Sequence, residues 1–107
     1  MSFYTVSELP ATEMSPGIVR RSVYLDHAMI TFFEFEPGSV LPVHDHPHEQ
    51  ITYVVSGAME FRQGDEVRVL RAGDGACTSP GVAHGGVVLD EPTFAVDAWY
   101  PRREEYK

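Results

Sequence analysis

The stretch HDHPHEQ, residues 44–50, gathers three of the chain's five histidines together with two acids and an amide. Neutral imidazole is the commonest metal ligand in proteins. On an extended strand, side chains two residues apart lie on one face, so His44, His46 and Gln50 share a face. His84 follows a tight Pro-Gly turn later in the chain and supplies a fourth donor. We therefore predict a site for one divalent transition metal formed by His44, His46, Gln50 and His84.

The predicted ligand set carries no charge, which decides the kind of chemistry it favours. Three imidazoles and an amide leave the charge of a divalent ion uncompensated, so the ion acts as a stronger Lewis acid. A neutral set also favours the lower oxidation state of a redox metal, which suits isomerase or lyase chemistry better than redox cycling. The metal itself stays open among Mn, Fe, Ni and Zn. His48 follows Pro47 in the turn and Glu49 has the opposite parity, so neither is expected to bind the metal.

The length and composition of the chain exclude several classes of protein. A chain of 107 residues, 43% hydrophobic and 22% charged, is expected to form one globular domain over 1–107. A net charge of −8 with scattered arginines excludes binding to a nucleic-acid backbone. Cys77 stands alone, so no intrachain disulfide is possible, and no segment indicates a membrane span. The opening MSFYTVSELP lacks the features of a signal peptide, so we expect a cytoplasmic protein.

Short runs rich in β-branched and aromatic residues recur along the chain and are separated by turn signals. Their spacing of about eight to twelve residues is typical of an antiparallel sandwich or barrel. No segment has a helical period. The dipeptides SG at 56–57 and GD at 64–65 predict two hairpins. The expected strands cover 17–25, 28–36, 50–56, 58–63, 66–71, 75–79, 84–89 and 93–100.

Two motifs in this pattern resemble those of the cupin family. The first reads GSVLPVHDHPHEQITYVVSG from Gly38 to Gly57, with Gln50 where the family usually has Glu. The second reads GDGACTSPGVAHGGVV from Gly73, with a serine and a valine where the family expects proline and asparagine. The resemblance implies an all-β, cupin-type jelly-roll barrel and matches His84 to the family's last metal ligand.

The ending VDAWYPRREEY adds an acid, an aromatic residue and a cation. Asp97 and Trp99 share strand parity and Arg103 follows a Pro101 turn, so the three side chains could meet at one mouth of the barrel. An ion-paired acid, a packed indole and a solvated arginine are the alternative interpretation. The combination is similar to small single-domain cupins of pectin and alginate breakdown, which open 4,5-unsaturated uronates into linear keto acids.

This resemblance implies an enzyme acting on a small anionic sugar acid. Asp97 and Arg103 would be catalytic, with Asp97 moving a proton and Arg103 pairing with the substrate carboxylate. Trp99, with Arg103, would bind the substrate and form an apolar wall. Two alternatives remain open, a metal-dependent dioxygenase of a small organic substrate and a non-enzymatic module that binds or senses a small ligand.

Two features near the N-terminus concern assembly and charge. The segment FYTVSEL, 3–9, alternates apolar and polar residues without an adjacent hairpin partner, and open sheet edges need covering. We therefore expect a homodimer, which the resemblance also implies. Arg20 and Arg21 are adjacent on an expected strand, so one of them must face inward or toward an edge, and the sequence does not decide which.

Overall fold

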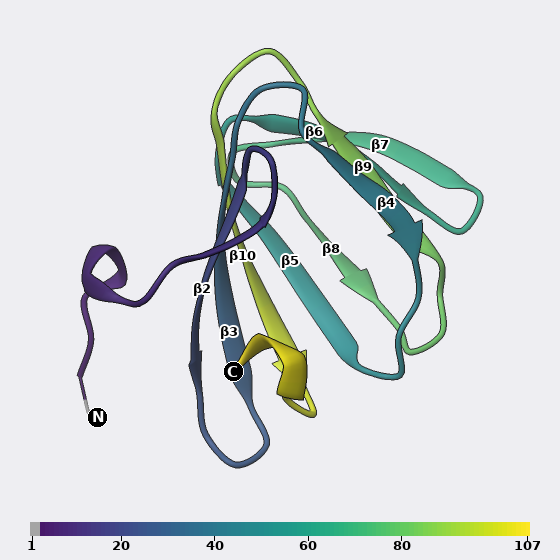
Figure 1. The fold of residues 1–107 in the computed structure, drawn as a ribbon. Coiled ribbons are helices and arrows are strands. Elements are labelled where there is room, and N and C mark those ends of the chain that lie inside the picture. The colour runs from purple at the N-terminus through teal and green to yellow at the C-terminus, as the bar shows by residue number, and fades with distance from the viewer. Residues whose placement is uncertain (1–2) are drawn as a thin grey trace.

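The computed structural model describes residues 3–107 and consists of strands joined by short turns (Figure 1). The described residues contain ten strands and two single turns of 3₁₀ helix, η1 and η2. In chain order the elements are η1 Val6–Glu8, β1 Thr12–Ser15, β2 Ile18–Tyr24, β3 Met29–Phe35, β4 Val40–His44, β5 Glu49–Ser56, β6 Ala58–Gln63, β7 Glu66–Arg71, β8 Gly75–Thr78, β9 His84–Val88, β10 Thr93–Tyr100 and η2 Glu104–Tyr106.

The strands form two sheets that face each other (Figure 1). One has six strands in the order β1-β2-β3-β10-β5-β8, and the other has four in the order β4-β9-β6-β7. All neighbouring strands are antiparallel, and the chain changes sheet several times, for example between β3 and β4. The predicted all-β jelly-roll barrel is confirmed.

An apolar core lies between the sheets. In the central strands, alternate residues point inward, as the burial patterns along β5 and β10 illustrate. The core draws Phe33, Phe35 and Val54 from the six-stranded sheet, and Met59 and Phe61 from the four-stranded one. Because both sheets contribute, neither buries its apolar face without the other.

Two strands escaped prediction, and one predicted hairpin is wrong. All four residues of β1 are exposed, and β4 contains Pro42, so neither shows the apolar alternation by which strands are found. The GD turn does join a hairpin, since β6 and β7 pair from Gln63 opposite Glu66. The SG turn instead connects β5 in one sheet to β6 in the other, so these strands do not pair.

The two ends of the chain lie in different surroundings. The N-terminal segment with η1 extends away from the barrel beside β2, whereas η2 lies close to the end of β10 (Figure 1). The alternating segment 3–9 therefore contains a 3₁₀ turn and no strand. Within residues 3–107, no helix has the length and apolar character needed to cross a membrane.

The turn between β5 and β6 requires glycine at residue 57. Gly57 has φ +86°, and a Cβ added there would lie 2.6 Å from the Pro92 carbonyl oxygen. We expect Gly57→Ala to lower the free energy of unfolding by about 2–4 kcal/mol, because a left-handed backbone and a clash with main chain combine. Urea unfolding followed by circular dichroism measures this change in the free energy of unfolding.

Gly64→Ala is the matched control for this prediction. Gly64 also has a positive φ, +58°, but no atom lies within 4 Å of an added Cβ. Only the backbone cost remains, so the loss should be about 1 kcal/mol. Equal losses for the two variants would contradict the role assigned to the close contact at Gly57.

Candidate active site

Three histidines from separate segments converge at one end of the barrel. His44 ends β4 and lies opposite His84, which begins β9, while His46 lies in the loop between β4 and β5. Their candidate ligand atoms all lie within 4.8 Å of one another. The expectation that His44, His46 and Gln50 lie on one strand is wrong, because β4 ends at His44 and β5 begins at Glu49. The loop between the strands brings them together instead.

Each of the three histidines is oriented by a backbone carbonyl two residues away. The Nδ1 atom of every ring lies within hydrogen-bonding distance of such an oxygen, and a carbonyl can only accept. Nδ1 therefore carries the proton in the neutral ring and Nε2 keeps its lone pair, as in protein metal sites. For His44, His46 and His84 the carbonyls are those of Pro42, His48 and Val82, at 2.9, 3.1 and 2.8 Å.

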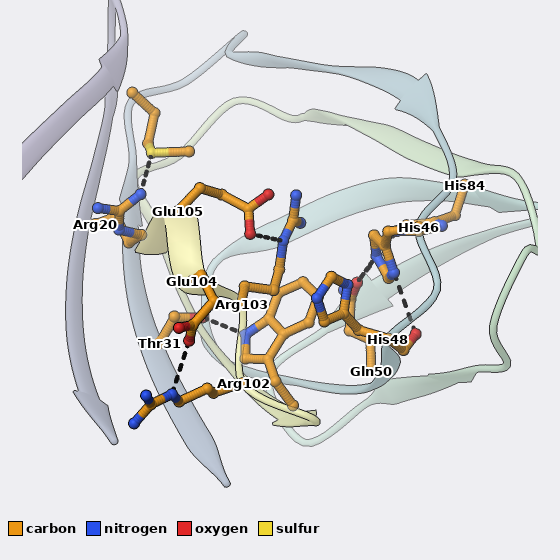
Figure 2. Close-up of polar contacts among 12 residues, drawn as sticks. Arg20, Thr31, His46, His48, Gln50, His84, Arg102, Arg103, Glu104 and Glu105 are labelled. Atoms are coloured by element: carbon orange, nitrogen blue, oxygen red, sulfur yellow. Dashed lines mark hydrogen bonds and ion pairs between the residues drawn. The ribbon is translucent and has the colours of Figure 1, made fainter. Parts of the chain in front are cut away.

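Gln50 presents an oxygen to the same point. Its Nε2 donates to the Thr52 hydroxyl at 3.0 Å, which fixes the amide so that Oε1 faces the histidines. Oε1 lies 3.0 Å from His46 Nε2 and 3.1 Å from His84 Nε2 (Figure 2). With Nδ1 protonated, the lone pairs of His46 Nε2, His84 Nε2 and Gln50 Oε1 face one another. A cation bound between these atoms would remove their mutual repulsion. The residues therefore fit a divalent metal ion.

The electrostatics of the histidines agree with this fit. Burial lowers the pKa of His46, whereas the nearby Gln50 oxygen acts in the opposite direction because it could accept a hydrogen bond only from the protonated ring. Burial also lowers the pKa of His84, opposed by its hydrogen bond to the Val82 carbonyl. Both rings are therefore neutral at physiological pH, which is the state in which imidazole binds metals.

A cavity of about 480 Å³ lies between the sheets and includes this centre in its wall. Its polar residues gather where β4 and β10 end and where β5 and β9 begin. The remaining wall is largely apolar and includes Phe33, Phe35, Met59 and Phe61. The volume is in the range that holds a small-molecule ligand, and the few polar groups would orient it.

Asp97 lies inside this cavity on β10, in register with Thr52 of β5 and Thr31 of β3. It is buried, and its Oδ1 has no hydrogen-bond partner among residues 3–107. Burial raises the pKa of Asp97 to about 6, although Thr52, Gln50 and Arg103 act in the opposite direction. A carboxyl group in this position can accept or release a proton near neutral pH.

Trp99 and Arg103 line the same cavity as Asp97. The Trp99 indole donates from Nε1 to the Thr31 hydroxyl at 2.9 Å, and its ring centre lies 5.1 Å from that of His46. The Arg103 guanidinium lies over the same indole, 5.0 Å from the ring centre. Its side chain is only 12% exposed, so it is not a solvated arginine. Six of the seven predicted site residues therefore line this cavity, and the seventh, His46, lies beside it with its Nε2 3.0 Å from Gln50 Oε1.

Three nearby residues received no role from the sequence. Thr52 orients the Gln50 amide, and strand parity could have identified it because it is two residues from Gln50. The His48 carbonyl orients His46, and the half-buried His48 ring lies edge-on to Trp99 at 6.2 Å. Tyr106 also lines the cavity, although nothing in its spacing indicates this.

Comparisons with known proteins agree with the fold. The family model described as "Cupin domain" matches residues 31–98. The pectin degradation protein KdgF of Dickeya dadantii (strain 3937) is 30% identical over 106 residues, which are 97% of this chain and 96% of that protein.

Two solved structures superpose over the whole chain. KdgF from Halomonas sp. has a TM-score of 0.93 and 33% identity, covering 100% of this chain and 99% of that one. An RmlC-like cupin from Shewanella frigidimarina has a TM-score of 0.94 and 27% identity, covering 100% and 96%.

The geometry of the three histidines predicts the metal content of the purified protein. We expect about one divalent ion per chain, and we expect His84→Ala to lose it because a buried donor is removed. Elemental analysis after dialysis measures the content. His27→Ala is the matched control, because this histidine lies outside the cluster and should leave the content unchanged. Equal metal in the His84→Ala and unaltered proteins would exclude the site.

Proposed function

This chain belongs to the cupin family, and we propose that it is a metal-dependent enzyme that opens the ring of a 4,5-unsaturated uronate to a linear keto acid. One observation carries the proposal: the buried carboxyl group of Asp97 shares a cavity with the histidine cluster, Trp99 and Arg103. The relatives named KdgF support it, because one of them is described as a pectin degradation protein and pectin is a polymer of uronic acids.

Recognition of an anion needs a local positive charge in this acidic chain. With a net charge of −8, the protein as a whole repels a carboxylate. Arg103 lies at the cavity with little exposure, and its Nη1 is buried without a partner among residues 3–107. A guanidinium binds a carboxylate through two parallel hydrogen bonds, so we assign Arg103 to the substrate carboxylate. Trp99 supplies the flat apolar wall against the sugar ring.

The reaction is an isomerisation, so its atoms balance without a co-reactant. The anomeric hydroxyl loses its proton, the bond from the anomeric carbon to the ring oxygen breaks, and an aldehyde and an enol result. The enol then becomes a ketone when a proton is added at carbon 4 and the enol hydroxyl loses its proton. Asp97 is the group that accepts and returns the proton in these steps. A bound divalent ion supplies Lewis acidity that polarises a substrate oxygen.

We also propose that the protein is a homodimer that works in the cytoplasm. The outer face of the six-stranded sheet supports the dimer, because Ile51, Tyr53 and Val55 of β5 stay exposed there beside Ala98 and Tyr100 of β10. A second copy is a suitable occupant, since these five patch residues carry no charge and the exposed acid Glu49 lies at one end of the patch, opposite Tyr100.

Replacing Asp97 tests the proposed catalyst. Asp97→Asn has the same shape but cannot exchange the proton, so we expect it to keep its metal and fold while turnover falls about a hundred- to ten-thousandfold. The assay follows the loss of ultraviolet absorbance of an unsaturated uronate at matched metal content. Arg103→Ala is the contrasting variant in the same assay, because loss of a binding group should raise the Michaelis constant more than it lowers the maximal rate.

Two outcomes of this assay would contradict the proposal. An Asp97→Asn variant as fast as the unaltered protein would remove Asp97 from the mechanism. If the unaltered, metal-loaded protein converts no unsaturated uronate, the reaction itself is wrong. Loss of some other activity on exclusion of air would then identify a dioxygenase, whereas a ligand bound without turnover would identify a binding module.

Placing a charge on the outer sheet face tests the homodimer. We expect the unaltered protein to be a dimer at micromolar concentration and Tyr53→Glu to be a monomer, because a buried unpaired carboxylate is costly. Val69→Glu is the matched control, since Val69 is exposed on β7 of the other sheet and should leave the mass unchanged. Light scattering measures the mass, and a monomeric unaltered protein would rule out the dimer.

A further inference from the structure

Arg20 and Arg21 point to opposite faces of β2 and have different surroundings. Arg21 Nη1 pairs with Glu34 at 2.8 Å on the outer face of the sheet. Arg20 lies opposite Phe33 of β3, faces the barrel interior and is 8% exposed. The inward arginine that the sequence required is therefore Arg20. The proposed reaction assigns no role to Arg20.

The buried guanidinium of Arg20 lacks a carboxylate partner. No ion pair reaches it from residues 3–107, and its Nε is buried without a hydrogen-bond partner. Its Nη1 lies 3.0 Å from the Met14 sulfur, a weak acceptor (Figure 2). A buried charge without a counter-charge is costly, so folding alone does not account for an arginine here.

Arg20 and Arg103 meet on one aromatic ring. Their Cζ atoms lie 4.4 Å and 4.2 Å from the centre of the Tyr106 ring. Tyr106 packs edge-on against Trp99, with ring centres 5.7 Å apart. Each cation is attracted to the ring, which holds Arg103 in place although the two positive charges repel each other. The pKa of Arg20 is lowered by burial, and the charge of Arg103 acts in the same direction.

Two carboxyl groups, those of Asp97 and Glu105, act on Arg103, and neither forms an ion pair with Arg20. Glu105 Oε1 lies 3.4 Å from Arg103 Nε, and its side chain is 58% exposed, so solvent screens the contact. Arg103, Tyr106 and Met14 line the cavity, and Arg20 lies directly behind them. The positive charge therefore lies at the cavity wall, where a ligand rather than the protein can supply the missing anion.

We propose that Arg20 is a positioning residue for the ligand's anionic group: through Tyr106 it holds Arg103, and its charge makes this part of the cavity select an anion over a neutral ligand. The inference rests on the proposed function in taking the ligand to be a uronate. It does not require that Arg20 touch the ligand. Its effect is on binding, so it should appear in affinity or in the Michaelis constant and leave the proton-transfer step unchanged.

The test compares charged and neutral probes of one shape. Binding of galacturonate and of its neutral methyl ester to the metal-loaded protein is measured by calorimetry. Arg20→Met, which keeps an unbranched apolar side chain but removes the charge, should weaken galacturonate binding about tenfold and leave the ester unchanged. Arg20→Lys keeps a charge near the ring and should stay within about threefold of the unaltered protein. Arg20→Gln replaces Arg20→Met if the latter does not fold.

Arg21→Met is the matched control, because it removes the neighbouring arginine from the opposite face and should change neither affinity. Unchanged galacturonate affinity in Arg20→Met would overturn the proposal. So would an equal loss for both probes, which marks a structural role, or no galacturonate binding by the unaltered protein. If galacturonate binds in an Arg20-dependent way but no unsaturated uronate is converted, the proposed reaction fails and the role of Arg20 stands.

Discussion

The hydrogen bonds from three histidine Nδ1 atoms to backbone carbonyls are the constraint on which the site depends. They are short-range, since each carbonyl lies two residues from its histidine. Because the main chain there is held by the pairing of β4 with β9 and by the loop into β5, the tautomer is set before any ion arrives. The Thr52 hydroxyl does the same for the Gln50 amide. The lone pairs of the histidines and of Gln50 therefore lie close together and repel one another, which favours binding of a cation over the metal-free site.

The barrel also places the charged side chains near the cavity in poorly solvated positions. The cavity wall is mostly apolar, so each polar group in it is poorly solvated. Burial raises the pKa of Asp97 and leaves donors of Arg20 and Arg103 without partners among residues 3–107. Such groups cost folding free energy, and they cluster in one cavity rather than through the core. A ligand with a carboxylate and hydroxyl groups would satisfy several of them at once.

The fold class and the grouping of three histidines that could hold a metal ion could be predicted because they depend on local patterns. Runs of β-branched and aromatic residues between turn signals identified eight of the ten strands described, and the pattern of His44, His46 and His84 indicated a metal site. The prediction had the wrong reason in one respect, since a loop and not a shared strand face brings His46 to His44. Strand β1 was missed because all its residues are exposed, so it has no buried apolar face to mark it as a strand in the sequence.

What the sequence by itself determined is the chemistry available: the ligand types, the neutral Gln50, and an acid, an indole and a cation near the C-terminus. Only the tertiary structure decided which of these groups meet. Whether Arg20 or Arg21 faces inward depends on which face of β2 packs against the core, and the partnership of Arg20 with Arg103 depends on Tyr106 folding back from the last turn. The contact of Arg20 with Tyr106 joins residues more than 80 positions apart, so no local spacing contains it.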